Sequence, residues 1–357
     1  MIRFNNDYSS GAIPEILEAL KETNETRYES YGLDELCEEA ADLIRSACGC
    51  SGKDADVHFA VGGTQANFLV ISSALRSFQS VIAADTSHIH CHETGAVENT
   101  GHKIEVIFGK DGKLSSEQVR AKADAYRRSS IPEHITQPKL VYLSFPTETG
   151  TLYSKSELTS IREVCLEYGL YLFVDGARMA YGLGSEKNDL TLADFARLTD
   201  AFTVGGTKCG ALFGEAVVLT HPALREDFRS VIKQHGPMLA KGWLSGLQFS
   251  VLFRNGKYLE LGKYACGLAS LLRNAFLEKG IPLCPDSPTN QLFVRLTRKQ
   301  KEIIEKDFIF EPEDESEDGT TVVRFCTSWY TKPEDVSVLR QAILELPQLK
   351  SRSRKGK

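Results

Sequence analysis

The stretch that decides the fold is residues 170–178, which read LYLFVDGAR. Residues 170–174 are all apolar or aromatic, which is typical of a buried strand in a parallel sheet. Asp175 follows at once, so we expect its carboxylate at the carboxyl end of that strand, where open α/β sheets bind ligands. An acid in this place can hold a protonated ring nitrogen. It can equally cap the segment that follows, and the stretch alone leaves both interpretations open.

Similar runs lie on both sides of this one. Between about residues 56 and 220 they alternate with segments of helical periodicity, the pattern of βαβ units around a mostly parallel sheet. The clearest helix is expected after Ser154, because Ser154 and Glu157 form a capping box and Gly169 ends the apolar stripe. The other candidate strands are 57–60, 80–84, 103–108, 139–145, 201–204 and 215–219.

A lysine follows the candidate strand at 201–204. Residues 205–210 read GGTKCG, so Lys208 lies among glycines and small residues directly after a buried strand. Such a setting can desolvate the amine, which lowers its pKa and makes it a nucleophile. A random surface lysine rarely has these neighbours, and Lys208 is therefore a candidate catalytic residue.

A glycine turn precedes a helix earlier in the chain. Residues 61–67 read VGGTQAN and join the candidate strand 57–60 to an apolar helical stretch. Amides at a helix N-terminus bind anions, so Gly63 and Thr64 form a candidate phosphate site, although a plain turn would look the same. The glycine spacing of dinucleotide folds and P-loops is missing, which disfavours NAD and ATP. Phosphate site, ring-nitrogen acid and reactive lysine together predict pyridoxal phosphate as the cofactor.

The pattern changes after about residue 245. A helix is expected over 257–279, extended segments over 290–296 and 321–327, and a final helix from Pro333. We therefore expect an α/β fold whose large domain, 1–245 with an N-terminal arm, has a mostly parallel sheet and helices on both faces, and whose smaller α+β domain covers 246–350. The acidic residues 311–319 are predicted to be a solvated loop, and the basic residues 351–357 a disordered tail.

Composition narrows the possible partners and location. The 357 residues include 42 Lys and Arg against 48 Asp and Glu, a net charge of −6, which argues against a nucleic-acid partner. No stretch approaches the roughly 18 apolar residues that span a bilayer. The nine cysteines are odd in number and scattered, as in reducing compartments, so we expect a cytoplasmic protein.

With these residues the chain resembles the threonine aldolases, which are fold-type I pyridoxal-phosphate enzymes grouped with the β-eliminating lyases. The resemblance covers nearly the whole chain and implies cleavage of L-threonine or L-allo-threonine to glycine and acetaldehyde. A β-eliminating lyase or aminotransferase on the same scaffold, and a non-catalytic small-molecule-binding domain, are the alternatives. The matching residues are Asn6-Asp7, Tyr31-Gly32, 63–67, His88 with 93–95, 174–178, Thr207-Lys208, and Arg324 with 327–329.

The resemblance also implies a role for each of these positions. Lys208 would bind the cofactor covalently, Asp175 would pair with the pyridine nitrogen, and His88 would stack on the ring. Arg178 and Arg324 would face the substrate carboxylate or the cofactor hydroxyl. The phosphate would lie against Gly63, Thr64 and Thr207, the substrate near Asn6 and Glu148, and Tyr31 and Lys241 would come from the neighbouring chain of a homodimer or homotetramer.

Two departures from the family pattern affect the chemistry. Asn6 stands where the family usually has serine, which puts one carboxylate contact in doubt. Glu148 stands where many members have a histidine near the substrate hydroxyl. We therefore expect His88 to accept the hydroxyl proton, with Glu148 as its competitor. A metal site of His88, His90, His92 and Glu93 is the rival interpretation, but helical geometry would splay the rings, and we predict no metal.

Overall fold

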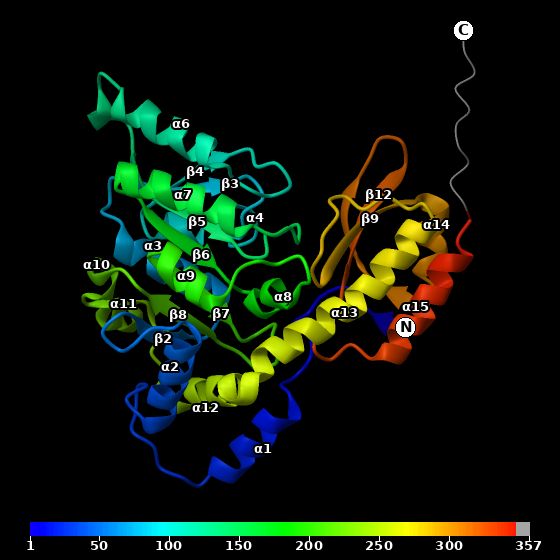
Figure 1. The fold of residues 1–357 in the computed structure, drawn as a ribbon, viewed down its shortest axis with the longest axis horizontal. Coiled ribbons are helices and arrows are strands. Elements are labelled where there is room, and N and C mark those ends of the chain that lie inside the picture. Colours follow the sequence, from blue (N-terminus) through cyan, green and yellow to red (C-terminus); the bar gives the residue numbers. More distant parts are fainter. Residues whose placement is uncertain (348–357) are drawn as a thin grey trace.

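The computed structural model describes residues 1–347, so the basic tail predicted at 351–357 lies outside the described residues. A seven-stranded sheet forms its centre (Figure 1), and every strand expected between residues 56 and 220 is confirmed. Strand β8 is antiparallel to both of its neighbours and the other pairs are parallel, as the pattern predicted. The order is β2 (Asp56–Ala60), β8 (Glu215–Leu219), β7 (Ala201–Gly205), β6 (Tyr171–Asp175), β5 (Gln137–Ser144), β3 (Gln79–Ala84) and β4 (Lys103–Ile107).

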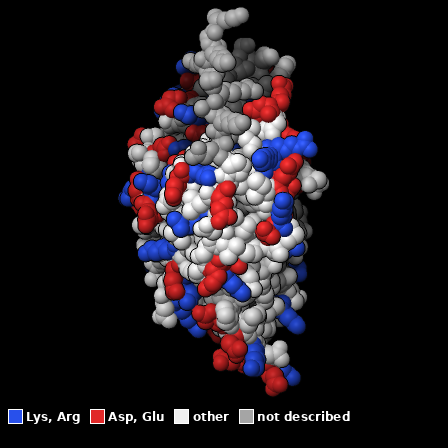
Figure 2. Space-filling model, turned by 90° about the vertical axis from the view of Figure 1, so that its right-hand side faces the viewer, with Lys and Arg blue, Asp and Glu red and all other residues white. Residues whose placement is uncertain are grey.

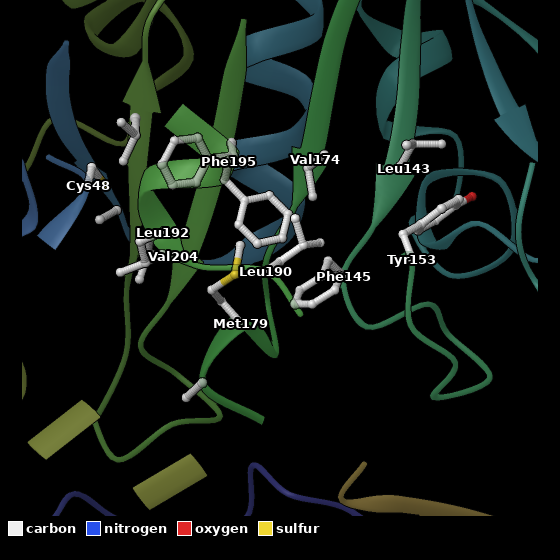
Figure 3. Close-up of a cluster of buried hydrophobic side chains, with 14 of the residues drawn as sticks. Cys48, Leu143, Phe145, Tyr153, Val174, Met179, Leu190, Leu192, Phe195 and Val204 are labelled. Carbon is white, nitrogen blue, oxygen red and sulfur yellow. The ribbon is translucent and has the colours of Figure 1, made fainter. Parts of the chain in front are cut away.

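Successive side chains of the central strands point to opposite faces of the sheet, so an apolar core forms on each face. On β6, Val174 points into one apolar cluster and Phe173 into the other, as the two-residue period of a strand requires. Figure 3 shows part of the first cluster, where Val174, Phe145 and Phe195 lie together. Because both faces are buried, the central strands are continuously apolar, which is why residues 170–174 could be recognised.

Helices cover both faces. The first cluster is closed by α1 (Pro14–Thr23), α2 (Glu35–Ala47), α6 (Ser116–Arg127), α7 (Lys155–Tyr168), α8 (Met179–Gly184), α9 (Leu192–Leu198) and α12 (Trp243–Phe253). The second is closed by α3 (Gly63–Ala74), α4 (His88–Cys91), α5 (Ala96–Asn99), α10 (Pro222–Arg225) and α11 (Phe228–His235). Helix α7 has the predicted capping box at Ser154 and ends at Gly169 in the left-handed conformation.

A smaller layer follows, with a three-stranded antiparallel sheet in the order β11 (Glu311–Glu315), β12 (Thr320–Cys326) and β9 (Gln291–Thr297). Its core is closed by α13 (Lys257–Glu278), α14 (Arg298–Ile304) and α15 (Pro333–Glu345). Tyr258 of α13 packs in the first cluster and Leu272 in this one, so α13 joins the two layers (Figure 1).

The N-terminal arm also reaches the smaller layer. Strand β1 (Ile2–Arg3) pairs in parallel with β10 (Phe308–Ile309), and Phe4 is buried in the smaller core. The domain limits at residues 245 and 350 stay predictions.

The prediction of a solvated loop over 311–319 was wrong in its first half. Residues Glu311–Glu315 form β11, which pairs with β12, and only the following turn around Gly319 is a loop. Pairing is possible because the backbone makes the bonds while the acidic side chains of this edge strand stay exposed.

The surface on the side of the smaller layer carries interspersed basic and acidic side chains (Figure 2). Across residues 1–347, no helix combines the length and the apolar character needed to cross a membrane.

Candidate active site

The candidate site lies where β6 and β7 end, at the carboxyl edge of the parallel strands. Two glycines let these ends approach closely. A Cβ on Gly176 would lie 2.0 Å from the carbonyl oxygen of Thr203, and one on Gly205 would lie 2.2 Å from that of Ala177. Because any other residue would collide with backbone, the segment after Asp175 and the segment leading to Lys208 can only meet through glycine.

Asp175 is 5% exposed and its carboxylate is held by several donors. Its Oδ2 accepts hydrogen bonds from Tyr142 Oη at 2.6 Å and Asn67 Nδ2 at 2.9 Å, and its Oδ1 accepts one from the Ala177 amide at 2.8 Å. Burial would raise the pKa of Asp175, but the charge of His88 and these donors hold the pKa below its usual range. Asp175 therefore stays ionised at neutral pH although it is buried.

A second buried acid connects this carboxylate to the candidate base. Asn67 Nδ2 also donates to Glu93 Oε1 at 2.8 Å, and the same oxygen lies 2.7 Å from His88 Nδ1. Burial lowers the pKa of His88, but the hydrogen bond that His88 donates to Glu93 and the charges of Glu148 and Asp175 outweigh it and raise the pKa above its ordinary value. With Nδ1–H directed at Glu93, the Nε2 atom of His88 is left to accept a proton.

Lys208 stands in the loop after β7. Its carbonyl accepts a hydrogen bond from Tyr181, and its charge acts on Asp175 and on Asp7. The charge of Lys208 lowers the pKa of Glu215 on β8. Burial has the larger effect and raises the pKa of Glu215 to about 8, so this acid is mainly protonated at pH 7. Among the residues the structure describes, Lys208 Nζ forms no ion pair, so no acid holds the end of this side chain.

The N-terminus of α3 faces open space. The first helical hydrogen bond runs from the Ala66 amide to the Gly62 carbonyl, so the amides of Gly63, Thr64 and Gln65 have no partner within the helix. A Cβ on Gly62 or Gly63 would meet no atom within 4 Å. An anion can approach these amides directly, with the helix dipole in its favour.

The donor set fits pyridoxal phosphate. An ionised buried acid suits a protonated pyridine nitrogen, a free amine suits the aldehyde, and uncapped amides suit the phosphate. Gln65 Oε1 is buried with no hydrogen-bond partner in the described part of the chain. Thr207 Oγ1 lies beside Lys208 and accepts a hydrogen bond from the Gly214 amide at 3.0 Å.

Two arginines flank this set, and their surroundings differ. Arg178 is buried and binds Asp7 through two parallel hydrogen bonds, Nε to Oδ2 at 2.7 Å and Nη2 to Oδ1 at 3.0 Å. Asn290 Nδ2 donates to the same Asp7 at 2.8 Å. Burial would raise the pKa of Asp7, but Arg178 holds it below its usual range. Arg178 Nη1 does not bind Asp7 and lies 4.0 Å from Glu148 Oε2.

Arg324 on β12 has looser partners. Its Nη1 lies 3.3 Å from Glu313 Oε1, and its Nη2 donates to the Asn5 carbonyl at 3.5 Å. The Nε atom is buried and has no hydrogen-bond partner among residues 1–347. Arg324 therefore has donors to offer a carboxylate.

Comparisons with known proteins identify the family. Residues 4–299 match the model of the β-eliminating lyases. The chain is also 31% identical over 349 residues to the low specificity L-threonine aldolase of a Pseudomonas species, covering 94% of this chain and 95% of that protein. The chain belongs to the threonine aldolase family. Membership confirms the resemblance stated from the motifs.

Solved structures agree with this assignment. A threonine aldolase from Leishmania major superposes with a TM-score of 0.92 at 44% identity, over 96% of this chain and 100% of that one. An Escherichia coli protein with a methionine aminotransferase function shares the fold, with a TM-score of 0.75 at 16% identity over 97% of this chain and 94% of that one. The predicted fold-type I class is confirmed, and the protein is a pyridoxal-phosphate-dependent lyase.

Two residues predicted for the site of this threonine aldolase family member, Tyr31 and Lys241, are exposed and have other partners within one chain. Tyr31 is 43% exposed, its amide donates to the Ala240 carbonyl at 3.1 Å, and Lys233 Nζ lies 4.7 Å from its ring centroid. Lys241 is exposed in the same region. Their role across an interface stays a prediction.

Asn6 does not contact either arginine. Its Oδ1 accepts a hydrogen bond from the Tyr8 amide at 3.2 Å, and the neighbouring Asp7 binds Arg178 instead.

The residues of the rival metal site lie on and just after a short helix. His88 and His90 lie on α4, His92 follows it, and the ring centroids of His88 and His92 are 5.5 Å apart. His88 is engaged by Glu93. Within the described range, no group of three or more His, Cys, Asp or Glu side chains is arranged to hold a metal ion.

Four side chains of the site had no role from sequence reasoning: Asp7, Asn67, Tyr142 and Asn290. Asn67 had a usable signal, because it lies one helical turn after Gly63 and so on the side of α3 that begins at the phosphate site. The contacts of Asp7 with Arg178 join residues 171 positions apart, and no local pattern marks such a pair.

Proposed function

We propose that this protein cleaves the Cα–Cβ bond of L-threonine or L-allo-threonine and releases glycine and acetaldehyde. The observation that carries the proposal is the chain of buried hydrogen bonds from Asp175 through Asn67 and Glu93 to His88. It joins a buried carboxylate that could hold a ring nitrogen to a histidine that could accept a proton. The relatives named low specificity L-threonine aldolase support the same substrate class.

Pyridoxal phosphate, when bound, supplies an electron sink for the pair of electrons released from the Cα–Cβ bond. Lys208 would hold it covalently through Nζ, and Asp175 would bind the protonated pyridine nitrogen. The phosphate would be held by the amides of Gly63 and Thr64 and by the Thr207 hydroxyl.

His88 would stack on the pyridine ring and accept the β-hydroxyl proton at Nε2, because its Nδ1–H is held by Glu93. Glu148 is the competing acceptor. Its Oε2 lies 4.0 Å from Arg178 Nη1, so the Glu148 carboxylate already has a cationic neighbour on the side of Arg178. A proton must return to Cα before glycine leaves, and Lys208 would donate it from its ammonium form.

The substrate carboxylate would bind Arg324, whose guanidinium has unused donors, while Arg178 is held mainly by Asp7. Asn6 would stand at the edge of this region.

We further propose a homodimer or homotetramer with shared active sites, in which Tyr31 and Lys241 act in the neighbouring chain. Both side chains are exposed, and the partners of Tyr31 within one chain, Ala240 and Lys233, are not residues of the candidate site. A cytoplasmic location is supported by nine free cysteines, six of them buried singly in the cores.

A product assay tests the function. Incubate the cofactor-loaded enzyme with L-threonine, L-allo-threonine, L-serine and L-alanine, and score aldehyde, ammonia and keto acid separately. We expect acetaldehyde and glycine in equal amounts from the two threonines. Ammonia with keto acid would instead indicate β-elimination, and keto acid that requires an amino acceptor would indicate an aminotransferase.

A further inference from the structure

The ion pair at Arg324 depends on a local irregularity of the smaller sheet. Strand β11 pairs Glu311 with Arg324 and Pro312 with Val323, but Asp314 pairs with Val322. Glu313 is therefore an extra residue in a β-bulge, and bulges re-aim side chains. Its Oε1 reaches Arg324 Nη1 at 3.3 Å, whereas no other acid of β11 forms an ion pair with an arginine among the residues described, although the backbone of Glu311 pairs with Arg324.

Glu313 also faces the candidate site. Burial and the neighbouring Glu311 raise the pKa of Glu313, while the charges of Arg324, His92 and Arg178 oppose this rise. Two of these three cations, His92 and Arg178, belong to the large layer, and the ion pair places Glu313 at the arginine that would receive the substrate carboxylate.

We propose that Glu313 is an internal competitor for Arg324 which an incoming amino-acid carboxylate must displace. This rests on the proposed function, in which Arg324 binds that carboxylate. The contact of Glu313 with Arg324 is a single one at 3.3 Å, between side chains that are 19% and 32% exposed, and it lacks the second hydrogen bond of a bidentate pair. A substrate carboxylate can bind two guanidinium donors at once, including the unpartnered Nε.

The side chain of Glu313, once displaced from Arg324, can move into solvent. Strand β11 is at the edge of its sheet and all five of its residues are exposed, so Glu313 can turn into water without unfolding anything. Its competition weakens ground-state binding and leaves the reacting atoms untouched. Glu313 therefore sets KM and not kcat.

The test compares Glu313→Gln with Glu315→Gln in the cofactor-loaded enzyme. Glu315 lies on the same strand and is exposed. Its substitution removes the same charge, so it controls for the change in the protein's net charge. We expect Glu313→Gln to lower KM for L-threonine and Kd for glycine by about two- to fivefold, as for the loss of one monodentate ion pair, with kcat within twofold. Glu315→Gln should change neither constant by that much. Glycine binding is read from the visible spectrum and from the shift in Tm.

Glycinamide, which lacks the carboxylate, supplies a further control, because its affinity should be the same in Glu313→Gln and the parent. In an Arg324→Lys background the Glu313→Gln change should lose most of its effect. A higher KM in Glu313→Gln would show that Glu313 positions Arg324, and unchanged KM and Kd would show that the pair is inert; either overturns the proposal. Failure of the proposed function would appear differently, as a parent that binds glycine but makes no aldehyde.

Discussion

At the scale of single residues, the site is organised around one amide. Asn67 Nδ2 donates to both Glu93 and Asp175, so two buried carboxylates share one donor. Each acid then has a different task. Glu93 binds the His88 imidazole, and Asp175 would bind the protonated ring nitrogen of the cofactor. His88 and Asp175 are thereby connected through Asn67, which keeps the distance between the proton acceptor and the acid that would hold the cofactor constant.

The first prediction concerns the proton acceptor. Replacing His88 with Asn should lower kcat by roughly 10²-fold or more, the usual contribution of a general base. Glu148→Gln should cost much less. Turnover of the two variants across pH, with cofactor content measured, checks this. If His88→Asn retains parental turnover and Glu148→Gln does not, Glu148 is the base and His88 only stacks.

The second prediction concerns the pKa of that base. His88 must be neutral to accept a proton, so activity falls as pH drops through its pKa, which Glu93 helps to raise. Glu93→Gln removes the charge, lowers the pKa of His88 and should move the acid limb of the kcat profile to lower pH. Its kcat at the plateau should also fall, because His88 loses its orienting partner. Glu98→Gln, an exposed acid five residues away, is the control. If the acid limb of the kcat profile stays at the same pH in Glu93→Gln, then His88 is not the group whose titration causes that limb.

At the scale of elements, the carboxyl edge depends on how closely β6 and β7 approach. Gly176→Ala would place a methyl group 2.0 Å from the Thr203 carbonyl and 2.7 Å from Met179 Cε. Since backbone cannot yield as a side chain tip can, we expect a loss of about 1–3 kcal/mol or more in the free energy of unfolding, with weaker cofactor binding. Gly267→Ala on α13 meets no atom within 4 Å and should stabilise by up to about 1 kcal/mol. Equal urea midpoints for the two variants would contradict this account of the edge.

Elements were predictable where one local rule decided them. Residues 170–174 are apolar throughout because both faces of β6 are covered, and the capping box fixed the start of α7. The acidic strand β11 was missed because its pairing is made by backbone groups, which the side-chain pattern does not report. For the same reason the bulge at Glu313, and with it the contact to Arg324, has no signature in the sequence.

At the scale of the molecule, the site is assembled from three distant parts. Asp7 of the N-terminal arm binds Arg178 after β6 and Asn290 before β9, so both layers meet at one buried acid. Lys208, Asp175 and the α3 glycines could be found from sequence because each follows a strand. The contacts of Asp7 could not, since they join segments up to 283 residues apart.

A mixing experiment tests the shared active site. Lys208→Ala and Lys241→Ala should each be poorly active alone. If Lys241 acts in the neighbouring chain, unfolding and refolding the two together should restore part of the activity, because one site of each hybrid dimer then has both native lysines. Sedimentation at assay concentration should show at least a dimer. No gain on mixing, or an active monomer, would remove the proposal.

The most direct test of the central claim, that the carboxyl edge of β6 and β7 is the cofactor site, is a peptide map after borohydride reduction. Reduction fixes pyridoxal phosphate irreversibly to the lysine that holds it. We predict that the purified yellow enzyme bleaches on reduction and that one peptide, containing Lys208, gains the mass of the reduced cofactor, while Lys208→Ala yields no labelled peptide. A label on another lysine, or an active parent with no label at all, would contradict the account.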